Sequence, residues 1–285
     1  MTSPAEPPVV LPRIAVLGAG SMGGAIVAGV VESGATVEGG ITAVNRTRAK
    51  ADALALPGVE SLALEEDPGA TSRALAGARL VLVGVKPAGV PALLDEIREA
   101  LEPGALVVSI AAGVTIATME ARVPNPVVRT MPNTPSTVRR GVTGVAAGDR
   151  VDAAGRALVH ALFETVGTVV ELPEDRIDAL GTVAGSGPAY VFLLMEEMTA
   201  AARAMGFDAA DARTLVEETF AGASALLAAS DVDPAELRRR VTSPKGSTER
   251  AIAVYQAAGL AGMFEEGMRA ALARSREMAA EAAGA

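Results

Sequence analysis

The order of apolar runs and helical patterns constrains the fold of this chain more than any other feature. From residue 13 to about residue 172, short and nearly continuous apolar runs alternate with segments of helical periodicity. Apolar strands separated by helices are typical of a parallel sheet that is covered on both faces. After Leu172 only helical patterns follow. The sequence therefore predicts a Rossmann-like, doubly wound, mostly parallel α/β sheet followed by an all-helical domain.

The predicted boundaries follow from this change of pattern. Residues 1–12, with four prolines, are expected to form a flexible N-terminal arm, residues 13–172 the α/β domain, and residues 173–285 the helical domain. The predicted strands are Arg13–Leu17, Ile41–Val44, Ser61–Leu64, Leu80–Val85, Leu106–Ile110, Val127–Met131, Thr143–Ala147 and Thr168–Leu172. The predicted helices are 22–33, 47–54, 69–76, 90–100, 115–121, 150–165, 174–204, 208–229, 234–240, 248–258 and 260–282.

Composition excludes several kinds of function. The 285 residues carry a formal net charge of −9, and they include no cysteine and a single histidine, His160. An acidic chain lacks the basic surface with which proteins neutralise nucleic-acid phosphates. Without cysteine, disulfides, thiolate catalysis and cysteine-ligated metals are all excluded. We expect neither a nucleic-acid partner nor a metal site.

The uncharged run Ile14–Val31 is long enough to suggest a signal peptide or a membrane helix. It contains five glycines, which suit a turn followed by a closely packed helix far better. We therefore expect a cytoplasmic protein with no membrane partner.

A glycine-rich turn follows the first predicted strand and opens the first predicted helix. It reads Gly18-Ala-Gly20-Ser21-Met22-Gly23-Gly-Ala25. In such a G-x-G-x-x-G motif the first glycine allows the tight turn, the second lets the backbone approach a pyrophosphate, and the third allows close packing of helix on strand. The motif predicts a dinucleotide site that includes Gly18, Gly20, Ser21, Met22 and Gly23. The alternative is a glycine-rich turn without a ligand.

The end of the second strand discriminates between cofactors. NAD-selective sites usually place a carboxylate there to bind the ribose 2′-hydroxyl, whereas this chain reads Val44-Asn45-Arg46-Thr47. Arg46 can bind a 2′-phosphate, and Asn45 and Thr47 can donate hydrogen bonds to it. NADPH is therefore the predicted cofactor. The alternative is that Arg46 is a solvated surface residue and Asn45 only a turn former.

Three further strand ends carry turns that contain proline or glycine. Their candidate cofactor-binding residues are Val85, Lys86 and Pro87 after one strand, Ala111 and Gly113 after the next, and Met131, Pro132 and Asn133 after a third. The carboxyl ends of parallel strands line the ligand crevice of such sheets. Together these turns are expected to lie where a nicotinamide ring would bind, although each alone is an ordinary turn sequence.

A second glycine-containing turn lies in the helical half, within Val241–Ala251. Here Ser243, Gly246, Ser247 and Thr248 directly precede a helical pattern. The first backbone N–H groups of a helix lack partners within the helix, and the helix dipole is positive there. The turn is therefore a candidate site for a small carboxylate or phosphate. The alternative is an ordinary helix cap provided by Ser247 or Thr248.

Other features of the helical half suggest packing more than chemistry. The segment Ala179–Met195 carries no charge, and a helix that is apolar on every side must be buried. A domain of this size offers little interior, so we expect self-association through the C-terminal helices. Gly185–Tyr190 is either a packing kink or a close approach to a ligand, and these readings are compatible. His160 follows a helical pattern and is expected to be structural.

With these motifs in hand, the chain resembles the pyrroline-5-carboxylate reductase family from about residue 13 to about residue 278. The resemblance rests on Gly18–Ala25, Asn45-Arg46, Val85–Pro87, Met131–Pro135, Gly185–Tyr190 and Val241–Thr248. The last two segments are much more specific than the nucleotide motif, which many oxidoreductases share. There are two small departures. The family often has Asn where Ser21 stands, and Gly-Gly-Thr-Thr or similar where Lys245-Gly-Ser-Thr248 stands.

The resemblance implies NADPH-dependent hydride transfer to the C=N carbon of 1-pyrroline-5-carboxylate, giving L-proline in the last step of proline biosynthesis. NADH would serve at lower efficiency. The resemblance assigns the substrate carboxylate to the backbone N–H groups of Gly246, Ser247 and Thr248, with Ser243 nearby. It assigns the Thr248 hydroxyl, as the catalytic group, to the ring nitrogen. It also implies a homodimer or a higher homo-oligomer.

Two alternatives remain open at this point. One is another NADP-dependent imine or 3-hydroxyacid reductase with the same two-domain plan. Such hydroxyacid enzymes usually carry a catalytic lysine on an interdomain helix, whereas the only lysine after Lys86 is Lys245, in a turn. The other is a non-catalytic NADP-binding protein, in which the substrate residues would be degraded.

Overall fold

The computed structural model describes residues 9–283 and contains two compact units. The first unit runs to Ser186 and includes the chain again from Leu272, and the second unit is Gly187–Ala271. The last strand ends at Glu171, next to Leu172, where the strand patterns of the sequence stop. The assignment of residues 13–172 and 173–285 to separate functional domains stays a prediction.

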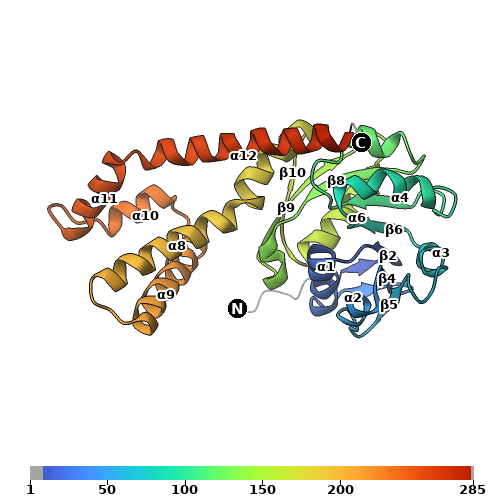
Figure 1. Ribbon diagram of the computed structural model, residues 1–285, viewed down its shortest axis with the longest axis horizontal. Coiled ribbons are helices and arrows are strands. Elements are labelled where there is room, and N and C mark those ends of the chain that lie inside the picture. The colour runs from blue at the N-terminus through green and yellow to red at the C-terminus, as the bar shows by residue number, and fades with distance from the viewer. Residues whose placement is uncertain (1–8, 284–285) are drawn as a thin grey trace. The chain divides into compact units, whose positions relative to one another are not determined.

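An eight-stranded sheet forms the centre of the first unit (Figure 1). In spatial order its strands are β10 (Gly167–Glu171), β9 (Gly141–Ala147), β8 (Val127–Met131), β7 (Leu106–Ser109), β6 (Leu80–Val83), β2 (Ile14–Leu17), β4 (Ile41–Asn45) and β5 (Val59–Ala63). All neighbouring strands are parallel except β8 and β9. The predicted mostly parallel sheet is confirmed, and the two last predicted strands extend it.

Helices cover both faces of this sheet. The helices of the first unit are α1 (Ser21–Glu32), α2 (Arg48–Asp52), α3 (Ala70–Leu75), α4 (Val90–Ile97), α5 (Ile116–Glu120), α6 (Ala153–Glu164) and α7 (Ile177–Leu180), with short 3-10 helices η1 (Pro87–Gly89), η2 (Thr134–Val138) and η3 (Glu174–Arg176). Leu94 and Met119 belong to the buried cluster on one face, and Ile26 and Phe163 to the cluster on the other. Since both faces are covered, the central strands are apolar throughout, as the doubly wound fold predicts.

The strand order places a crossover at the middle of the sheet. β2 lies between β6 and β4, so the chain leaves β2 toward one edge and later returns to its other side. In open α/β sheets, ligands bind at the carboxyl ends of the strands beside such a reversal. The turn that follows β2 is therefore at the position where this fold binds nucleotides.

The end of the expected N-terminal arm differs from the prediction. Val10–Leu11 form a strand, β1, which pairs in parallel with β3 (Thr36–Val37). The Leu11 side chain is fully buried. Four prolines suggested a loose segment, but the pairing partner lies some 25 residues later in the sequence, and burial of Leu11 fixes the end of the arm. Residues 1–8 of the predicted arm lie outside the described part of the chain.

The segment predicted as a single helix over 174–204 is interrupted in the structure. After η3 and α7 comes a π-helical turn, η4 (Gly181–Gly185), and only then the long helix α8 (Gly187–Ala204). π-helical turns inside helices often mark functional sites. Gly185, the last residue of this turn, begins the stretch Gly185–Tyr190 that was predicted as a kink or a close approach to a ligand, whereas Gly181 lies before it.

The second unit contains helices only. They are α8 (Gly187–Ala204), α9 (Ala209–Ala228), α10 (Pro234–Arg240), α11 (Ser247–Ala257) and the first part of α12 (Leu260–Ala283). α8 packs against α9, and Ala212 and Val216 of α9 are buried. Many apolar side chains of this unit are exposed, among them Phe192 and Leu193 on α8. The chain alone therefore leaves much of the apolar surface of this unit uncovered.

Close packing of α1 depends on Gly29 more than on Gly23. A Cβ added to Gly29 would overlap the Val166 side chain, whereas one added to Gly23 would meet its neighbours at ordinary distances of 3.5–3.8 Å. The sequence motif assigned the close helix–strand approach to Gly23. In the structure, the tightest approach is two turns further along the helix.

We predict that Gly29→Ala lowers the free energy of unfolding by about 1–3 kcal/mol, because the added methyl group overpacks a fully buried contact. Gly23→Ala, in the same helix, is the matched control and should change it by less than about 1 kcal/mol. Urea denaturation at one fixed protein concentration measures both. Equal effects of the two substitutions would contradict the assignment.

Candidate functional site

The turn between β2 and α1 lies against the turn that follows β6. Gly18 has φ +82°, and a Cβ at this position would lie 2.7 Å from Val85 Cγ1 and 2.9 Å from the Val85 backbone nitrogen. Only glycine tolerates both this conformation and this approach. The two turns are thus brought together at the crossover of the sheet, and Gly18 and Val85 are neighbours as predicted for one cofactor site.

The N-terminus of α1 is open to a ligand. Gly20 is its N-cap residue, without a side-chain cap, and an added Cβ there would meet nothing within 4 Å. Within residues 9–283, the backbone N–H groups of Ser21, Met22 and Gly23 have no hydrogen-bond partner, and the ladder begins with Gly24 N–H donating to Gly20 O at 2.7 Å. Unpaired N–H groups at the positive end of a 12-residue helix suit a pyrophosphate.

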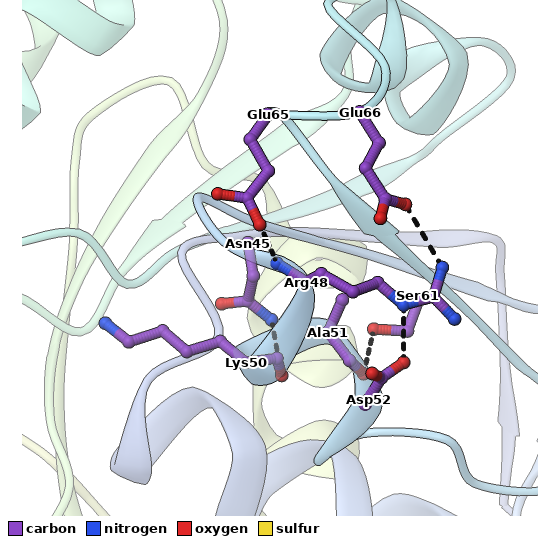
Figure 2. A network of polar contacts seen from close by, with 8 residues as sticks. All are labelled: Asn45, Arg48, Lys50, Ala51, Asp52, Ser61, Glu65 and Glu66. Carbon is purple, nitrogen blue, oxygen red and sulfur yellow. Dashed lines mark hydrogen bonds and ion pairs between the residues drawn. The ribbon is translucent and has the colours of Figure 1, made fainter.

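The residues predicted to select the cofactor lie at the end of β4, whose last residue is Asn45 (Figure 2). Asn45 is buried, and its side-chain amide donates to Lys50 O at 3.4 Å, so that it helps to hold the α2 turn. Arg46 is exposed, and no ion pair joins it to a described residue. Of the two residues, Arg46 is the one whose side chain remains available for a phosphate.

Arg48, two residues later, already forms ion pairs with carboxylates. Its guanidinium pairs with Asp52 at 2.7 Å and with Glu66 at 3.1 Å, and its backbone N–H donates to Glu65 Oε1 at 2.7 Å (Figure 2). The hydrogen bonds that the guanidinium donates to the carboxylates of Glu66 and Asp52 raise the pKa of Arg48 above its usual value. Lys50 points away from these carboxylates in the same view. Acidic side chains therefore hold Arg48 in place, and it cannot act as a free cation.

The turns after β6 and β7 carry the next predicted residues. Lys86 is the N-cap residue of η1 and Pro87 is its first residue. Ala111 is buried beneath the turn after β7, and Gly113 has φ +78°. A Cβ on Gly113 would lie 3.4 Å from Ala279 of α12, within the same compact unit. Both turns lie at the carboxyl end of the sheet, where the prediction places the nicotinamide.

The turn after β8 is fixed by polar contacts of its own. The Asn133 side chain is buried and donates to Ala184 O at 2.9 Å, while its Oδ1 accepts the Val142 N–H at 2.8 Å. Met131 lies against the π-helical turn. The Asn133 side chain is therefore committed to holding this turn, so any cofactor contact from Asn133 would come from its backbone.

The predicted anion turn lies in the second unit, at the start of α11. Gly246 is the N-cap residue and has no side-chain cap, so neither Ser247 nor Thr248 caps the helix. A Cβ on Gly246 would lie 2.5 Å from Ser243 Oγ and 2.9 Å from Ser243 O. The turn therefore requires glycine at this position, and it gathers Ser243, Gly246, Ser247 and Thr248 in one place.

The hydrogen bonds of this turn change the predicted set of donors. Gly246 N–H donates to Ser243 O at 3.0 Å, so it is not free as the sequence suggested. In the described chain, the N–H groups of Ser247, Thr248 and Glu249 have no partner, and the ladder begins with Arg250 donating to Gly246 O at 3.4 Å. Three adjacent free donors remain at this helix end. Ser247 and Thr248 were predicted, and Glu249 was not.

Glu249 also has a second contact that sequence reasoning missed. Lys245 has φ +61°, a left-handed conformation that is costly for a residue with a Cβ. Its backbone N–H donates to Glu249 Oε2 at 2.8 Å. The signal was present in the sequence as a glutamate three residues after the cap position, a spacing common at helix starts. Glu249 therefore stabilises the turn where the family has glycine in place of Lys245.

The basic end of α10 precedes this turn, and two of its three arginines pair with one carboxylate. Arg239 and Arg240 both donate to the Glu236 carboxylate, which holds the pKa of Glu236 at about 2. Hydrogen bonding to Glu236 also raises the pKa of Arg239. These two arginines are therefore engaged within their own helix. No ion pair joins Arg238 to a described residue, so the end of α10 keeps a net positive charge.

Comparison with known proteins identifies relatives over nearly the whole chain. Residues 174–278 match the family model for pyrroline-5-carboxylate reductase dimerisation. Residues 13–113 match the model described as NADP oxidoreductase, coenzyme F420-dependent. A pyrroline-5-carboxylate reductase of Pseudomonas aeruginosa is 40% identical over 274 residues, covering 94% of this chain and 97% of the relative.

Solved structures show the same similarity. A pyrroline-5-carboxylate reductase from Coxiella burnetii has a TM-score of 0.85 at 34% identity, covering 93% of this chain and 97% of that one. A Plasmodium falciparum pyrroline carboxylate reductase with NADP bound has a TM-score of 0.79 at 23% identity, covering 94% and 98%. At that identity the second similarity concerns the fold alone.

We predict that Asn133→Ala lowers the free energy of unfolding by about 1–3 kcal/mol, because Ala184 O and Val142 N–H both lose their partner. Asn133→Asp keeps the acceptor for Val142 N–H but sets a buried carboxylate against Ala184 O, so it should cost at least as much. Thermal denaturation of both variants, together with NADPH affinity, measures the effect. A variant of unchanged stability that binds NADPH poorly would show instead that the side chain contacts the cofactor.

Proposed function

The chain belongs to the pyrroline-5-carboxylate reductase family, and we propose that its own residues perform the reaction of that family in the following way. The enzyme reduces 1-pyrroline-5-carboxylate to L-proline with NADPH. The substrate carboxylate binds the free N–H groups at the start of α11, and the Thr248 hydroxyl hydrogen-bonds the ring nitrogen. The observation that carries this proposal is the set of three unpaired donors at Ser247, Thr248 and Glu249.

The reaction does not require a strong catalytic acid or base among the side chains. A hydride adds to the imine carbon, the C=N π electrons become the nitrogen lone pair, and the nitrogen carries one proton from solution in the protonated imine. The products are proline and NADP⁺. A protonated imine is already electrophilic, which fits a chain without cysteine and with one histidine. The protein has to hold, orient and hydrogen-bond the ring.

The turn before α11 supplies those three tasks from neighbouring atoms. The N–H groups of Ser247, Thr248 and Glu249 would receive the carboxylate, and Ser243 lies within the same turn. The Thr248 side chain is not used as a helix cap, so its hydroxyl is available to the ring nitrogen. Lys245 adds a positive charge beside this site.

The first unit would hold NADPH, which supplies the hydride when bound. The three unpaired N–H groups of α1 fit the pyrophosphate, and Gly20 leaves room for it. Arg46 would bind the 2′-phosphate, since Arg48 is paired with carboxylates. Lys86, Pro87, Ala111, Gly113 and Met131–Asn133 would surround the nicotinamide, mainly through their backbone.

The apolar surface of the helical unit supports self-association. By length and composition alone, Glu174–Ala204 is the one helical stretch in residues 9–283 that is long and apolar enough to cross a membrane. A groove of about 430 Å³ within the second unit is lined by Tyr190, Leu193, Leu194, Glu197, Leu260, Met263, Phe264, Gly267 and Met268. Exposed apolar patches of this kind favour protein contacts. We propose that a second copy covers this surface and that the enzyme is a cytoplasmic homodimer or larger homo-oligomer.

We predict that Thr248→Ala lowers kcat/KM for pyrroline-5-carboxylate by about one to two orders of magnitude, the loss of one hydrogen bond to a charged group. Thr248→Ser keeps the hydroxyl and should retain most of the activity. Steady-state kinetics at saturating NADPH measures both. A Thr248→Ala enzyme within twofold of the wild type would exclude this role.

We predict that Arg46→Ala raises KM for NADPH about tenfold or more, because a charge-assisted contact to the 2′-phosphate is lost. KM for NADH should change by less than about twofold, since NADH has no 2′-phosphate. Arg48→Ala is the matched control, two residues away and already paired. If Arg46→Ala affected both cofactors alike, the 2′-phosphate would have to bind elsewhere.

A further inference from the structure

One face of β8 and its continuation faces a single later segment of the chain. Arg129, Met131 and Asn133 alternate along the strand and the turn, so they lie on the same side. All three contact the segment Glu174–Gly185, which comprises η3, α7 and the π-helical turn η4. The turn after β8 is thus held along its length by one segment.

The buried member of this set is Arg129. Its side chain is only 4% exposed, and it pairs with Glu174 at 3.5 Å and, more closely, with Asp178. A buried charge is stable only when it is paired and hydrogen-bonded, and removing one partner of a buried ion pair strongly lowers the stability of the fold. Arg129 lies two residues before Met131, the start of the predicted nicotinamide turn. The ion pairs therefore fix the direction in which β8 ends.

Glu174 makes a second contact that reaches a different turn. The same oxygen, Oε1, accepts the Ile116 N–H at 2.7 Å at the start of α5. Thr115 is the N-cap residue of this helix, and Gly113 lies two residues before it. One carboxylate thus touches Arg129 of β8 and the helix that begins directly after the turn containing Ala111 and Gly113.

Met131 packs against two glycines of the π-helical turn. A Cβ on Gly181 would lie 2.9 Å from Met131 Cε, and one on Gly185 would lie 3.5 Å from it. Asn133 then satisfies Ala184 O of the same π-helical turn at 2.9 Å. The ion pairs of Arg129, the packing of Met131 and the amide contact of Asn133 therefore follow one another along β8 and the turn after it.

We propose that Arg129 and Glu174 are positioning residues for hydride transfer. They hold the turns after β7 and β8, and so set where the nicotinamide ring lies, without touching cofactor or substrate themselves. This inference rests on the proposed function, because it takes those two turns as the nicotinamide site. The inference goes beyond the proposed function because it assigns the placement of both turns to the carboxylate of Glu174, which is not among the predicted site residues.

The first test is Glu174→Gln, which keeps an acceptor for Ile116 N–H and removes one of the two carboxylates that pair with Arg129, leaving Asp178. We expect kcat to fall about tenfold, since a small misplacement of the reacting atoms lowers the rate strongly. Inhibition by adenosine 2′,5′-bisphosphate, which carries only the adenosine end of the cofactor, should stay within about twofold of the wild type. Arg122→Met is the matched control, because it breaks an exposed ion pair, to Asp95, at 2.6 Å.

A second variant separates positioning from folding. Arg129→Met combined with Glu174→Gln and Asp178→Asn removes all three charges of this cluster, so no unpaired charge stays buried, and its melting temperature should recover toward that of the wild type. Its kcat should stay low. A wild-type kcat in Glu174→Gln, or recovery of kcat together with melting temperature in the triple variant, would overturn the inference.

A third readout does not depend on turnover. The fluorescence of bound NADPH reports the surroundings of the reduced nicotinamide, and we expect it to differ between the wild type and Glu174→Gln at full occupancy. Unchanged fluorescence would contradict the inference. If the wild type bound NADPH but did not reduce pyrroline-5-carboxylate, the proposed function would fail, whereas the fluorescence comparison would still decide the role of Glu174.

Discussion

Unpaired backbone N–H groups at the start of two helices are the constraint on which the rest of this structure depends. The chain offers no cysteine and one histidine, so both of its candidate sites must be built mainly from main-chain donors. α1 leaves three such donors unpaired and α11 leaves three more within the described residues. Donors fixed in a helix need no reorganisation when an anion arrives, and the helix dipole favours negative charge there.

Both helix ends depend on glycines that allow the backbone to pass close to a neighbour. Gly18 brings the turn before α1 against Val85, and Gly246 brings the start of α11 against Ser243. A side chain at either position would move the donors away from their places. At α11 the adjoining Lys245 takes a left-handed conformation that glycine would adopt freely, and Glu249 compensates by accepting its N–H.

The strands of the sheet were predicted well because the patterns that indicate them lie within or next to the strands themselves. Apolar runs such as β6 need both faces buried, and the glycine motif follows β2 directly. The features that sequence reasoning missed are long-range. β1 pairs with β3, Asn133 bonds to Ala184 and Glu174 bonds to Ile116. No local pattern distinguishes such partners from solvated side chains, and the same holds for the donor set of α11, which depends on the turn that Gly246 closes.

The segment after the last strand therefore does more than connect the sheet to the helices. It begins with Glu174, which bonds to two elements of the sheet, and it ends in a π-helical turn that packs against Met131. These contacts relate the carboxyl edge of the sheet to the start of the helical region through directed polar bonds. An account of the enzyme that considers only residues touching the cofactor would leave out what holds them in place.

The central claim is that this chain couples NADPH oxidation to reduction of a cyclic imine acid. The most direct measurement is the loss of NADPH absorbance at 340 nm with pyrroline-5-carboxylate, combined with quantification of the proline formed. We predict rapid turnover with one proline formed per NADPH consumed. NADPH that binds tightly but is not oxidised with this substrate would contradict it.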